Sequence, residues 1–308
     1  MRRKILTTGI FNLDTIVVRD YPHGPEQQRK FTEAVAFEEV GGTCGNVSAI
    51  LSWLGQEVLP LAHFDESPEG MKLTDDLMRY GCDCRFVRND PEGGTTMLRC
   101  THKQDPDGTH RVSFRSGSPG GSRFPKRRFI RARDEVPAFL DRLGFTPDVF
   151  FFDDPAAGHR AIARALREKG TLVYFEPAAI ESRADLECVQ NSDIIKFSGE
   201  DIPDISFAGR FPDKLFIQTM GADGLRFKLG DDGWETLPPV PCSGVVDWEG
   251  AGDWTTSAFI SRLCREGRLS VSEMDTDFAR SVLVEAQGYA SRSVSFLGSK
   301  GLIHSEEN

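Results

Sequence analysis

The second half of the chain alternates short apolar runs with amphipathic stretches, and this alternation constrains the fold more than any other feature. The run 149–152 (VFFF) is apolar throughout, as expected of a strand buried on both faces. The stretch 159–170 places Ile162, Ala165 and Leu166 on one side of a helix and ends in glycine. Three more apolar runs follow, at 171–175, 193–197 and 214–219. Repeated strand–helix–strand units predict a mainly parallel sheet with helices on both faces, which is a three-layer α/β/α fold.

The first part of the chain continues the same pattern. An apolar run at 5–11 predicts a strand, and the stretch 45–55 has the apolar spacing of one helical face before it ends in glycine. The other expected elements are a strand at 57–64, a helix at about 71–80, and two closing helices at about 252–264 and 277–294.

Two segments, 15–40 and 95–114, do not fit this alternation. The second has alternating runs on either side of DPDG at 105–108, which is a hairpin signal. We expect both segments to supply strands of a small β-sheet that is inserted into a single α/β domain spanning 1–308. Such a sheet can act as a lid over a site, although a hairpin without that role fits the pattern equally well.

The charge of the chain narrows the choice of partners. Its 308 residues carry a formal net charge of −10, which argues against nucleic acid or an anionic membrane as the main partner. No apolar run approaches the length of a membrane span, and the first residues are typical of a strand and turn instead of a leader peptide. We therefore expect a soluble cytoplasmic protein that acts on a small molecule.

The sequence Gly250-Ala251-Gly252-Asp253 stands at the start of an expected helix. A helix N-terminus presents unpaired backbone N–H groups and a partial positive charge, and glycines let an anion approach them closely. The segment therefore suggests a cradle for phosphate, with Asp253 beside it. Taken alone, Asp253 also fits an ordinary acidic residue in a first helical turn.

Polar residues also gather at other strand ends and helix starts. The segment 41–46 places glycines before a helix, with Asn46 at its beginning, where an amide can cap the helix or hold a hydroxyl. Asp14 follows the first strand, and 219–224 follows the strand KLFIQ. Ligands of open α/β sheets bind outside the carboxyl ends of the strands, so these residues are candidates for one site.

The motifs in this order resemble those of the ribokinase-like (PfkB) carbohydrate kinases. GGTCGN at 41–46 and DWEGAGD at 247–253 are similar to the two signature regions of that family. GIFNLD at 9–14 resembles its first substrate loop, FDESPEG at 64–70 its second strand-to-helix turn, and TMGADG at 219–224 its nucleotide loop. The resemblance covers nearly the whole chain and implies a three-layer fold with a β-sheet lid.

The resemblance also implies transfer of the ATP γ-phosphate, with Mg²⁺, to a hydroxyl of a sugar or sugar acid. Asp253 would be the general base, and the anion hole would be formed by the backbone of Gly250, Ala251, Gly252 and Asp253. The residues implied for the substrate are Asp14, Gly42 and Asn46. The residues implied for the nucleotide are Thr219, Gly221, Gly224 and Gln287. A homodimer that pairs through the lid is a further implication.

The chain departs from the family pattern beside these residues. Trp248 and Glu249 replace the usual two threonines, which puts an anion beside the phosphate path, and Trp254 stands where Phe or Ala is usual. Asp247 matches a position that the family associates with a monovalent cation, so the resemblance implies a K⁺ site there.

The metal-linked N-x-x-E motif of the family is altered as well. Ser198 replaces its Asn, and either Glu200 or Asp201 would serve Mg²⁺ through water. Glu176 begins the sequence Glu-Pro-Ala where the family has Asp-Pro-Asn.

The acceptor stays open at this point among fructose, a ribose-like sugar and 2-keto-3-deoxygluconate. A sugar acid or sugar phosphate would need a cation, and the candidates for that role in or just after the lid hairpin are Arg99, Arg111 and Arg115. A nucleoside kinase would need an aromatic platform, for which Phe11 or Phe37 is available. A pseudokinase that senses a sugar or nucleotide is the alternative from another class, because of the altered residues beside the motif.

Overall fold

The computed structural model describes residues 2–20, 32–104, 110–117 and 129–307. Within them lies a large sheet with the strand order β13-β12-β11-β10-β9-β8-β1-β4-β5. Its strands are β1 (Lys4–Thr8), β4 (Glu57–Phe64), β5 (Val87–Asn89), β8 (Val149–Phe152), β9 (Leu172–Phe175), β10 (Ile194–Ser198), β11 (Leu215–Thr219), β12 (Leu225–Leu229) and β13 (Glu235–Leu237). Neighbouring strands from β5 to β11 pair in parallel, and β12 and β13 pair antiparallel at one edge.

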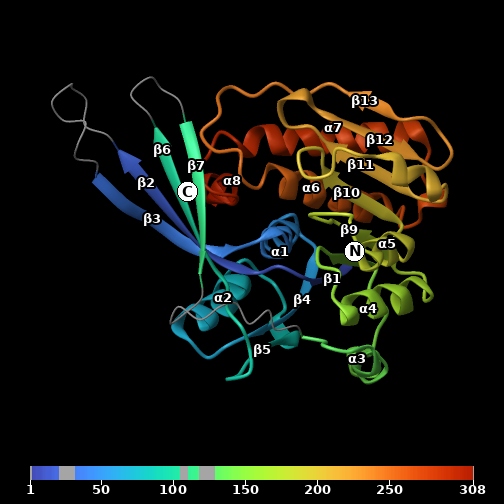
Figure 1. Ribbon diagram of the computed structural model, residues 1–308, viewed down its shortest axis with the longest axis horizontal. Helices are drawn as coiled ribbons and strands as arrows, with labels where there is room; N and C mark the ends of the chain where they lie inside the picture. The colour runs from blue at the N-terminus through green and yellow to red at the C-terminus, as the bar shows by residue number, and fades with distance from the viewer. Residues whose placement is uncertain (1, 21–31, 105–109, 118–128, 308) are drawn as a thin grey trace.

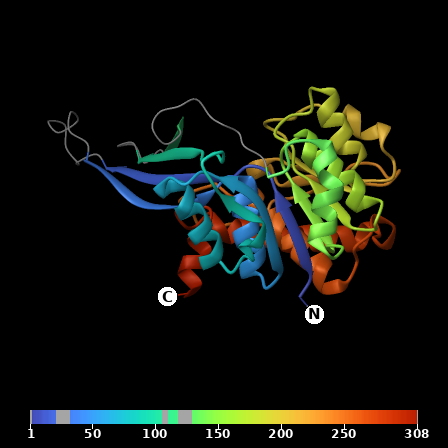
Figure 2. The ribbon, with the colours of Figure 1, turned by 90° about the horizontal axis from the view of Figure 1, so that it is seen from below.

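Helices cover both faces of this sheet (Figures 1 and 2). One face carries α1 (Thr43–Trp53), α2 (Pro68–Arg79), α6 (Ala251–Glu266) and α7 (Thr276–Ser293). The other face carries α3 (Val136–Leu143), α4 (Ala157–Arg167) and α5 (Arg183–Gln190). The predicted three-layer α/β/α fold with a mainly parallel sheet is therefore confirmed.

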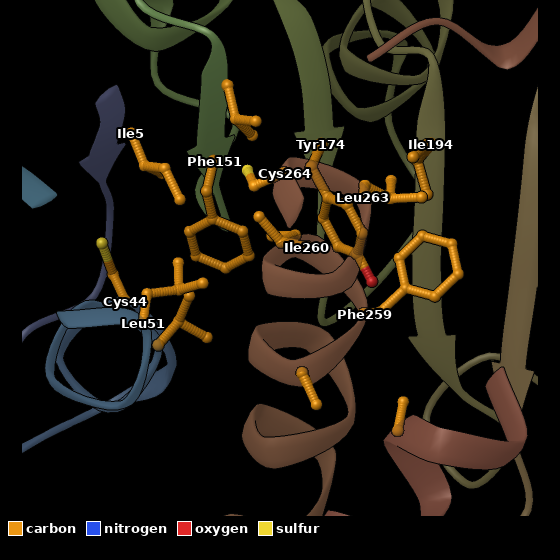
Figure 3. Close-up of a cluster of buried hydrophobic side chains, with 14 of the residues drawn as sticks. Ile5, Cys44, Leu51, Phe151, Tyr174, Ile194, Phe259, Ile260, Leu263 and Cys264 are labelled. Atoms are coloured by element: carbon orange, nitrogen blue, oxygen red, sulfur yellow. The ribbon is translucent and has the colours of Figure 1, made fainter. Parts of the chain in front are cut away.

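The strand side chains alternate between two apolar clusters, one beneath each helical layer. Phe151 and Tyr174 pack with Phe259 and Ile260 of α6 on the first face (Figure 3). Phe150 points to the opposite face of the sheet and belongs to the second cluster, which lies under α3 to α5. Burial on both faces explains why these strands read as continuous apolar runs.

A second sheet, with the strand order β3-β2-β6-β7, projects from the main body (Figure 1). Its strands are β2 (Asn12–Asp20), β3 (Thr32–Gly41), β6 (Met97–Gln104) and β7 (His110–Gly117). They come from the two segments that broke the alternation, while the DPDG turn at 105–108 lies outside the described residues. The action of this sheet as a lid stays a prediction.

Several elements of the structure are absent from our sequence-based prediction, among them β5, α3 and α5. The antiparallel strands β12 and β13 extend the sheet beyond β11, and α8 (Gly301–Glu307) follows the two expected closing helices. Helix α8 has only seven residues, too few for an apolar period to be recognised. Among the helices in the described ranges, none has both the length and the apolar character needed to cross a membrane.

Candidate active site

Polar residues meet where the parallel strands end. Asp153 directly follows β8, Glu176 directly follows β9 and Thr219 ends β11. The first turns of α1 and α6 also lie together, because Asn46 contacts Asp253. This edge of the sheet is the position at which α/β proteins bind ligands.

A chain of hydrogen bonds joins the starts of α1 and α6 to the segment before α8. The Asn46 amide nitrogen donates to Asp253 Oδ2 at 2.7 Å and to Ser299 Oγ at 3.2 Å. The amide oxygen accepts from Lys300 Nζ at 2.6 Å. Because lysine can only donate and a carboxylate can only accept, this arrangement fixes which end of the amide faces Asp253. Asn46 and Asp253, predicted separately, thus belong to one cluster.

The carboxyl group of Asp253 has a strongly perturbed acidity. Burial raises its pKa to about 7, and the nearby Glu176 carboxylate acts in the same direction. Lys196, the Asn46 hydrogen bond and Lys300 oppose this rise. A pKa near the working pH is the value that suits a general base.

The two glycines before Asp253 have separate structural reasons. Gly250 has φ +78°, and a Cβ there would lie 2.5 Å from the Cβ of Ser299. A Cβ on Gly252 would lie 2.9 Å from Lys196 Nζ. The Lys196 ammonium donates to the Gly252 carbonyl at 3.1 Å and to the Glu176 carboxylate. Ala251 begins α6, so its start combines exposed backbone with a nearby ammonium, which suits an anion.

Asp14 lies on β2, and its carboxylate is placed directly over the end of β3. A Cβ on Gly41 would be only 1.7 Å from Asp14 Oδ2, so this contact requires glycine. Gly42 caps α1 with φ +75°. Asp14 Oδ1 is buried and has no hydrogen-bond partner among the described residues. An unpartnered buried acceptor beside Gly42 is the feature expected where a substrate hydroxyl donates.

Burial also perturbs Asp14. Its pKa rises to about 7, mainly through desolvation; Lys300 lowers it, and the carboxylates of Glu39 and Glu249 raise it. Asp14 is therefore electrostatically coupled to the same lysine that contacts Asn46. This coupling places the three predicted substrate residues Asp14, Gly42 and Asn46 in one neighbourhood.

A residue that sequence reasoning did not identify holds the loop between β1 and β2. Asp153 Oδ1 accepts from the Ile10 amide at 2.9 Å, and Oδ2 accepts from the Cys44 amide at 3.0 Å. The carboxylate thus ties the loop before Asp14 to the first turn of α1. Its sequence signal was its position directly after a buried strand.

The predicted nucleotide residues lie on two elements. Thr219, Gly221 and Gly224 stand on the turn between β11 and β12, where Gly224 has φ +90° and a Cβ would lie 2.3 Å from the Leu237 carbonyl oxygen. Gln287 lies on α7, and its amide nitrogen is buried without a hydrogen-bond partner among the described residues. A buried free donor fits the contact with a ligand acceptor that was predicted for Gln287.

The predicted magnesium residues lie beside the same turn. Glu200 and Asp201 are exposed just after β10, where the Gly199 amide donates to the Thr219 carbonyl at 2.8 Å. Exposed carboxylates suit contact with hydrated Mg²⁺. The described part of the chain contains no cluster of three or more His, Cys, Asp or Glu residues that could hold a metal by itself.

The Asp247 side chain is buried and accepts backbone N–H groups from two segments. Its Oδ1 accepts from the Glu249 amide at 3.0 Å, and its Oδ2 accepts from the Gly298 amide at 2.9 Å. The His102 Nε2 atom lies 3.5 Å from the same Oδ2. These contacts hold the loop that leads to Ser299, and the K⁺ site at Asp247 stays a prediction.

The three residues that differ from the family pattern beside Asp253 have different surroundings. Trp254 is fully buried and its indole N–H donates to the Ser299 carbonyl at 2.7 Å. Trp248 is 48% exposed at the surface. Burial and the neighbouring Asp247 raise the pKa of Glu249 to about 7, so this group carries less negative charge near neutrality than an ordinary glutamate.

Lys300 is the main site residue that the sequence did not reveal. Its side chain is 1% exposed and lies 3.3 Å from Glu39 Oε1, in addition to its contact with Asn46. Glu39 in turn accepts from the Tyr80 hydroxyl at 2.8 Å. The segment FLGSKG gave no signal, because a single lysine between glycines is usually a surface residue.

The other candidates for acceptor recognition are less favourably placed. Arg99 pairs across the second sheet with Thr15 and Arg115, one position away from Asp14. Successive strand residues face opposite sides, so both arginines lie on the face away from Asp14. The side chain of Arg111 lies outside the described residues.

The two aromatic candidates for a base platform are engaged elsewhere. Phe11 is 7% exposed and packs edge-on against Phe64. Phe37 packs edge-on against His304 and lies directly against Gly298.

Solved structures match this arrangement along nearly the whole chain. Arabidopsis thaliana ribokinase, complexed with ribose and ATP, has a TM-score of 0.70 at 17% identity and covers 97% of this chain and 95% of its own. A microbiome-derived acarbose kinase has a TM-score of 0.71 at 16% identity, covering 97% and 95%. The Burkholderia thailandensis nucleoside kinase in complex with inosine has a TM-score of 0.63 at 15% identity, covering 96% and 92%. At these identities the similarity shows the fold alone.

Family membership comes from the sequence itself. No curated protein matches the chain. The pfkB family carbohydrate kinase model, however, matches residues 2–274, which include both glycine-rich segments and Asp253. The predicted resemblance is thereby confirmed, and the chain belongs to the pfkB family of carbohydrate kinases.

Proposed function

We propose that this protein transfers the γ-phosphate of ATP to a hydroxyl group of a sugar. The observation that carries the proposal is the contact between Asn46 and Asp253 at the start of α6. A carboxyl group whose pKa lies near 7 stands there beside the open end of a long helix. A proton acceptor and an anion cradle at one point are the two parts that phosphoryl transfer to an alcohol requires.

In this proposal the acceptor sugar lies between the start of α1 and β2. The free Oδ1 of Asp14 accepts from one sugar hydroxyl, and Asn46 and the backbone of Gly42 orient others. The hydroxyl to be phosphorylated donates to Asp253, which takes its proton as the new O–P bond forms and the bond from the γ-phosphorus to the bridging oxygen breaks, with ADP as the leaving group. The backbone N–H groups of Gly252 and Asp253 stabilise the negative charge on the transferring group, with Lys196 beside them.

Bound Mg·ATP would supply the phosphoryl group, and the described residues fit both parts of it. Thr219, Gly221 and Gly224 form an open turn for the nucleotide, and Gln287 offers a free buried donor. Glu200 or Asp201 would hold Mg²⁺ through water. No step is assigned to K⁺, whose site at Asp247 stays a prediction.

A neutral sugar fits the acceptor side better than a sugar acid or a nucleoside. Lys300 faces Asp14, Glu39 and Asp253, so a substrate carboxylate would enter a site already rich in negative charge. Arg99 and Arg115 lie on the opposite face of the sheet and do not offset that charge. A nucleoside would need a platform that neither Phe11 nor Phe37 offers.

The test is ADP release with Mg·ATP against neutral sugars, sugar acids, sugar phosphates and nucleosides. Asp253→Asn runs alongside as the matched variant. We expect turnover of a neutral sugar that falls by about 10²–10⁴-fold in Asp253→Asn, with nucleotide binding unchanged. Equal turnover in both proteins would remove Asp253 as the base. Tight sugar binding without ATP consumption across the panel would instead support the sugar-sensing alternative.

A further inference from the structure

Lys300 occupies an unusual place for a lysine. Its side chain is 1% exposed, although lysine is almost never fully buried unless it is paired. The ammonium lies against the Asn46 amide oxygen at 2.6 Å and against Glu39 Oε1 at 3.3 Å. Burial of a charged ammonium is unfavourable unless the group is paired, so its position beside Asn46 suggests that it has a function there.

We propose that Lys300 is a positioning residue of the acceptor site: it fixes the Asn46 amide, and through that amide and its own charge it favours the ionised form of the Asp253 carboxylate. The proposal rests on the proposed function in the role that it gives Asp253. It goes beyond that function because Lys300 itself takes no proton and contacts no phosphate.

The orientation step follows from donor and acceptor chemistry. The ammonium donates to Asn46 Oδ1, and therefore the amide nitrogen points at Asp253 Oδ2, 2.7 Å away. Without Lys300, the amide oxygen would lose its charged donor while the nitrogen kept its two acceptors. The lysine thus holds the amide from the side opposite to the base.

The charge step follows from the groups around Asp253. Glu176 and Lys196 form an ion pair, and their effects on Asp253 oppose each other. The Asn46 hydrogen bond also lowers the pKa of Asp253, and Lys300, which donates to the same amide, adds a smaller effect in the same direction. Lys300 therefore favours the ionised, proton-accepting form of the base.

Other titratable groups near Lys300 come from several elements. Glu39 of β3 faces the ammonium directly, and it also contacts Tyr80 of α2 and His304 of α8. Asp14 of β2 and Glu249, just before α6, complete the acidic surroundings. These carboxylates hold Lys300 in place as a cation and leave it little capacity to bind a substrate anion.

The backbone beside Lys300 is held from both sides. The Gly298 amide donates to Asp247, and the Ser299 carbonyl accepts from Trp254. Ser299 Oγ also accepts from the Asn46 amide nitrogen at 3.2 Å. The segment before Lys300 is therefore held in one position, which places the lysine beside Asn46 as a positioning role requires.

The test follows the Asp253 carboxyl group directly by NMR in the full-length protein, labelled with ¹³C at the aspartate carboxyl carbons. The resonance that disappears in Asp253→Asn belongs to Asp253, and its wild-type titration midpoint should lie at about 7. We expect Lys300→Met to move this midpoint upward by about one pH unit, as expected when a nearby opposite charge is lost. Lys300→Gln keeps a donor for Asn46 without the charge and should show the same shift, so it also serves if the Met variant does not fold.

Lys214→Met is the matched control. Lys214 is also 1% exposed, and its ammonium donates to the Gln190 and Ser192 carbonyls away from the site. It should destabilise the fold without moving the Asp253 midpoint. An unchanged midpoint in both Lys300 variants, or an equal shift in the control, would overturn the proposal.

Activity gives a second readout that separates charge from packing. A midpoint raised by about one pH unit reduces the ionised fraction at pH 7 by about fivefold, and the rate should recover as the pH approaches 9. A loss of the same size at every pH would overturn the electrostatic part of this role. If the wild type phosphorylates no acceptor, the proposed function fails, while the NMR midpoint still decides the role of Lys300.

Discussion

Asp14→Asn removes a buried negative charge while it keeps the shape of the side chain. The Asp14 carboxylate is 8% exposed, and its pKa is raised from the ordinary value of 3.8 to about 7, mainly by burial. The folded-state pKa therefore lies above that of the unfolded chain. The folded state holds the proton more tightly across this window, and the contribution of Asp14 to stability is lost as pH rises towards 7.

The size of the effect follows from the two pKa values. Each pH unit between them is worth about 1.4 kcal/mol, so ionisation of Asp14 costs the folded state about 4 kcal/mol above pH 7. The asparagine side chain does not ionise, so the variant does not lose this stability. We expect Asp14→Asn to match the wild type near pH 4 and to be more stable by up to about 4 kcal/mol at pH 8.

The assay is urea unfolding of the ligand-free proteins at several pH values between about 4 and about 8, a range that spans the titration. Asp231→Asn, at an exposed position, is the control and should give a small difference that does not vary with pH. The same Asp14 variant should bind the sugar about 10–100-fold more weakly, because it loses a hydrogen bond to a charged group. A stability difference that is constant with pH would refute the reasoning about burial.

Two further substitutions test the geometry of the acceptor site. Asn46→Ala should weaken sugar binding more than ATP binding in calorimetry, because it removes an amide of the sugar site and leaves Lys300 and Asp253 without their shared partner. Equal weakening of sugar and ATP binding would exclude Asn46 from the sugar site. Gly41→Ala places a Cβ 1.7 Å from Asp14 Oδ2, so the carboxylate must move. We expect that variant to lose about 1–3 kcal/mol of stability and most of its sugar affinity, whereas unchanged affinity would show that Asp14 does not contact the sugar.

The layered fold could be predicted from the sequence because burial on both faces produces a readable pattern. The strand Val149–Phe152 is apolar at every position, and its neighbours alternate with amphipathic helices. The strand β12 escaped this reasoning because its residues LRFKL alternate between buried and half-buried instead of forming an apolar run, and β13 has only three residues. Helix α8 was missed for the same reason of length.

The site could be predicted only where a motif marks the backbone. Glycine-rich segments reveal where a chain must approach a ligand or a neighbour, and Gly250 and Gly252 were found in this way. Lys300 and Glu39 carry no such mark, because a burial that depends on partners far along the chain leaves no local pattern. Their role becomes visible only when the segment before α8 is placed against Asn46.

One departure from the family pattern, Trp254, is connected to the candidate site. Trp254 donates to the Ser299 carbonyl, Ser299 contacts Asn46, and Asn46 donates to Asp253. A bulky indole after the base thus supports the segment that brings Lys300 to the acceptor side. The contacts of Trp254 therefore agree with the proposed function, in which the acceptor site is adapted, better than with a sensor that has lost its chemistry.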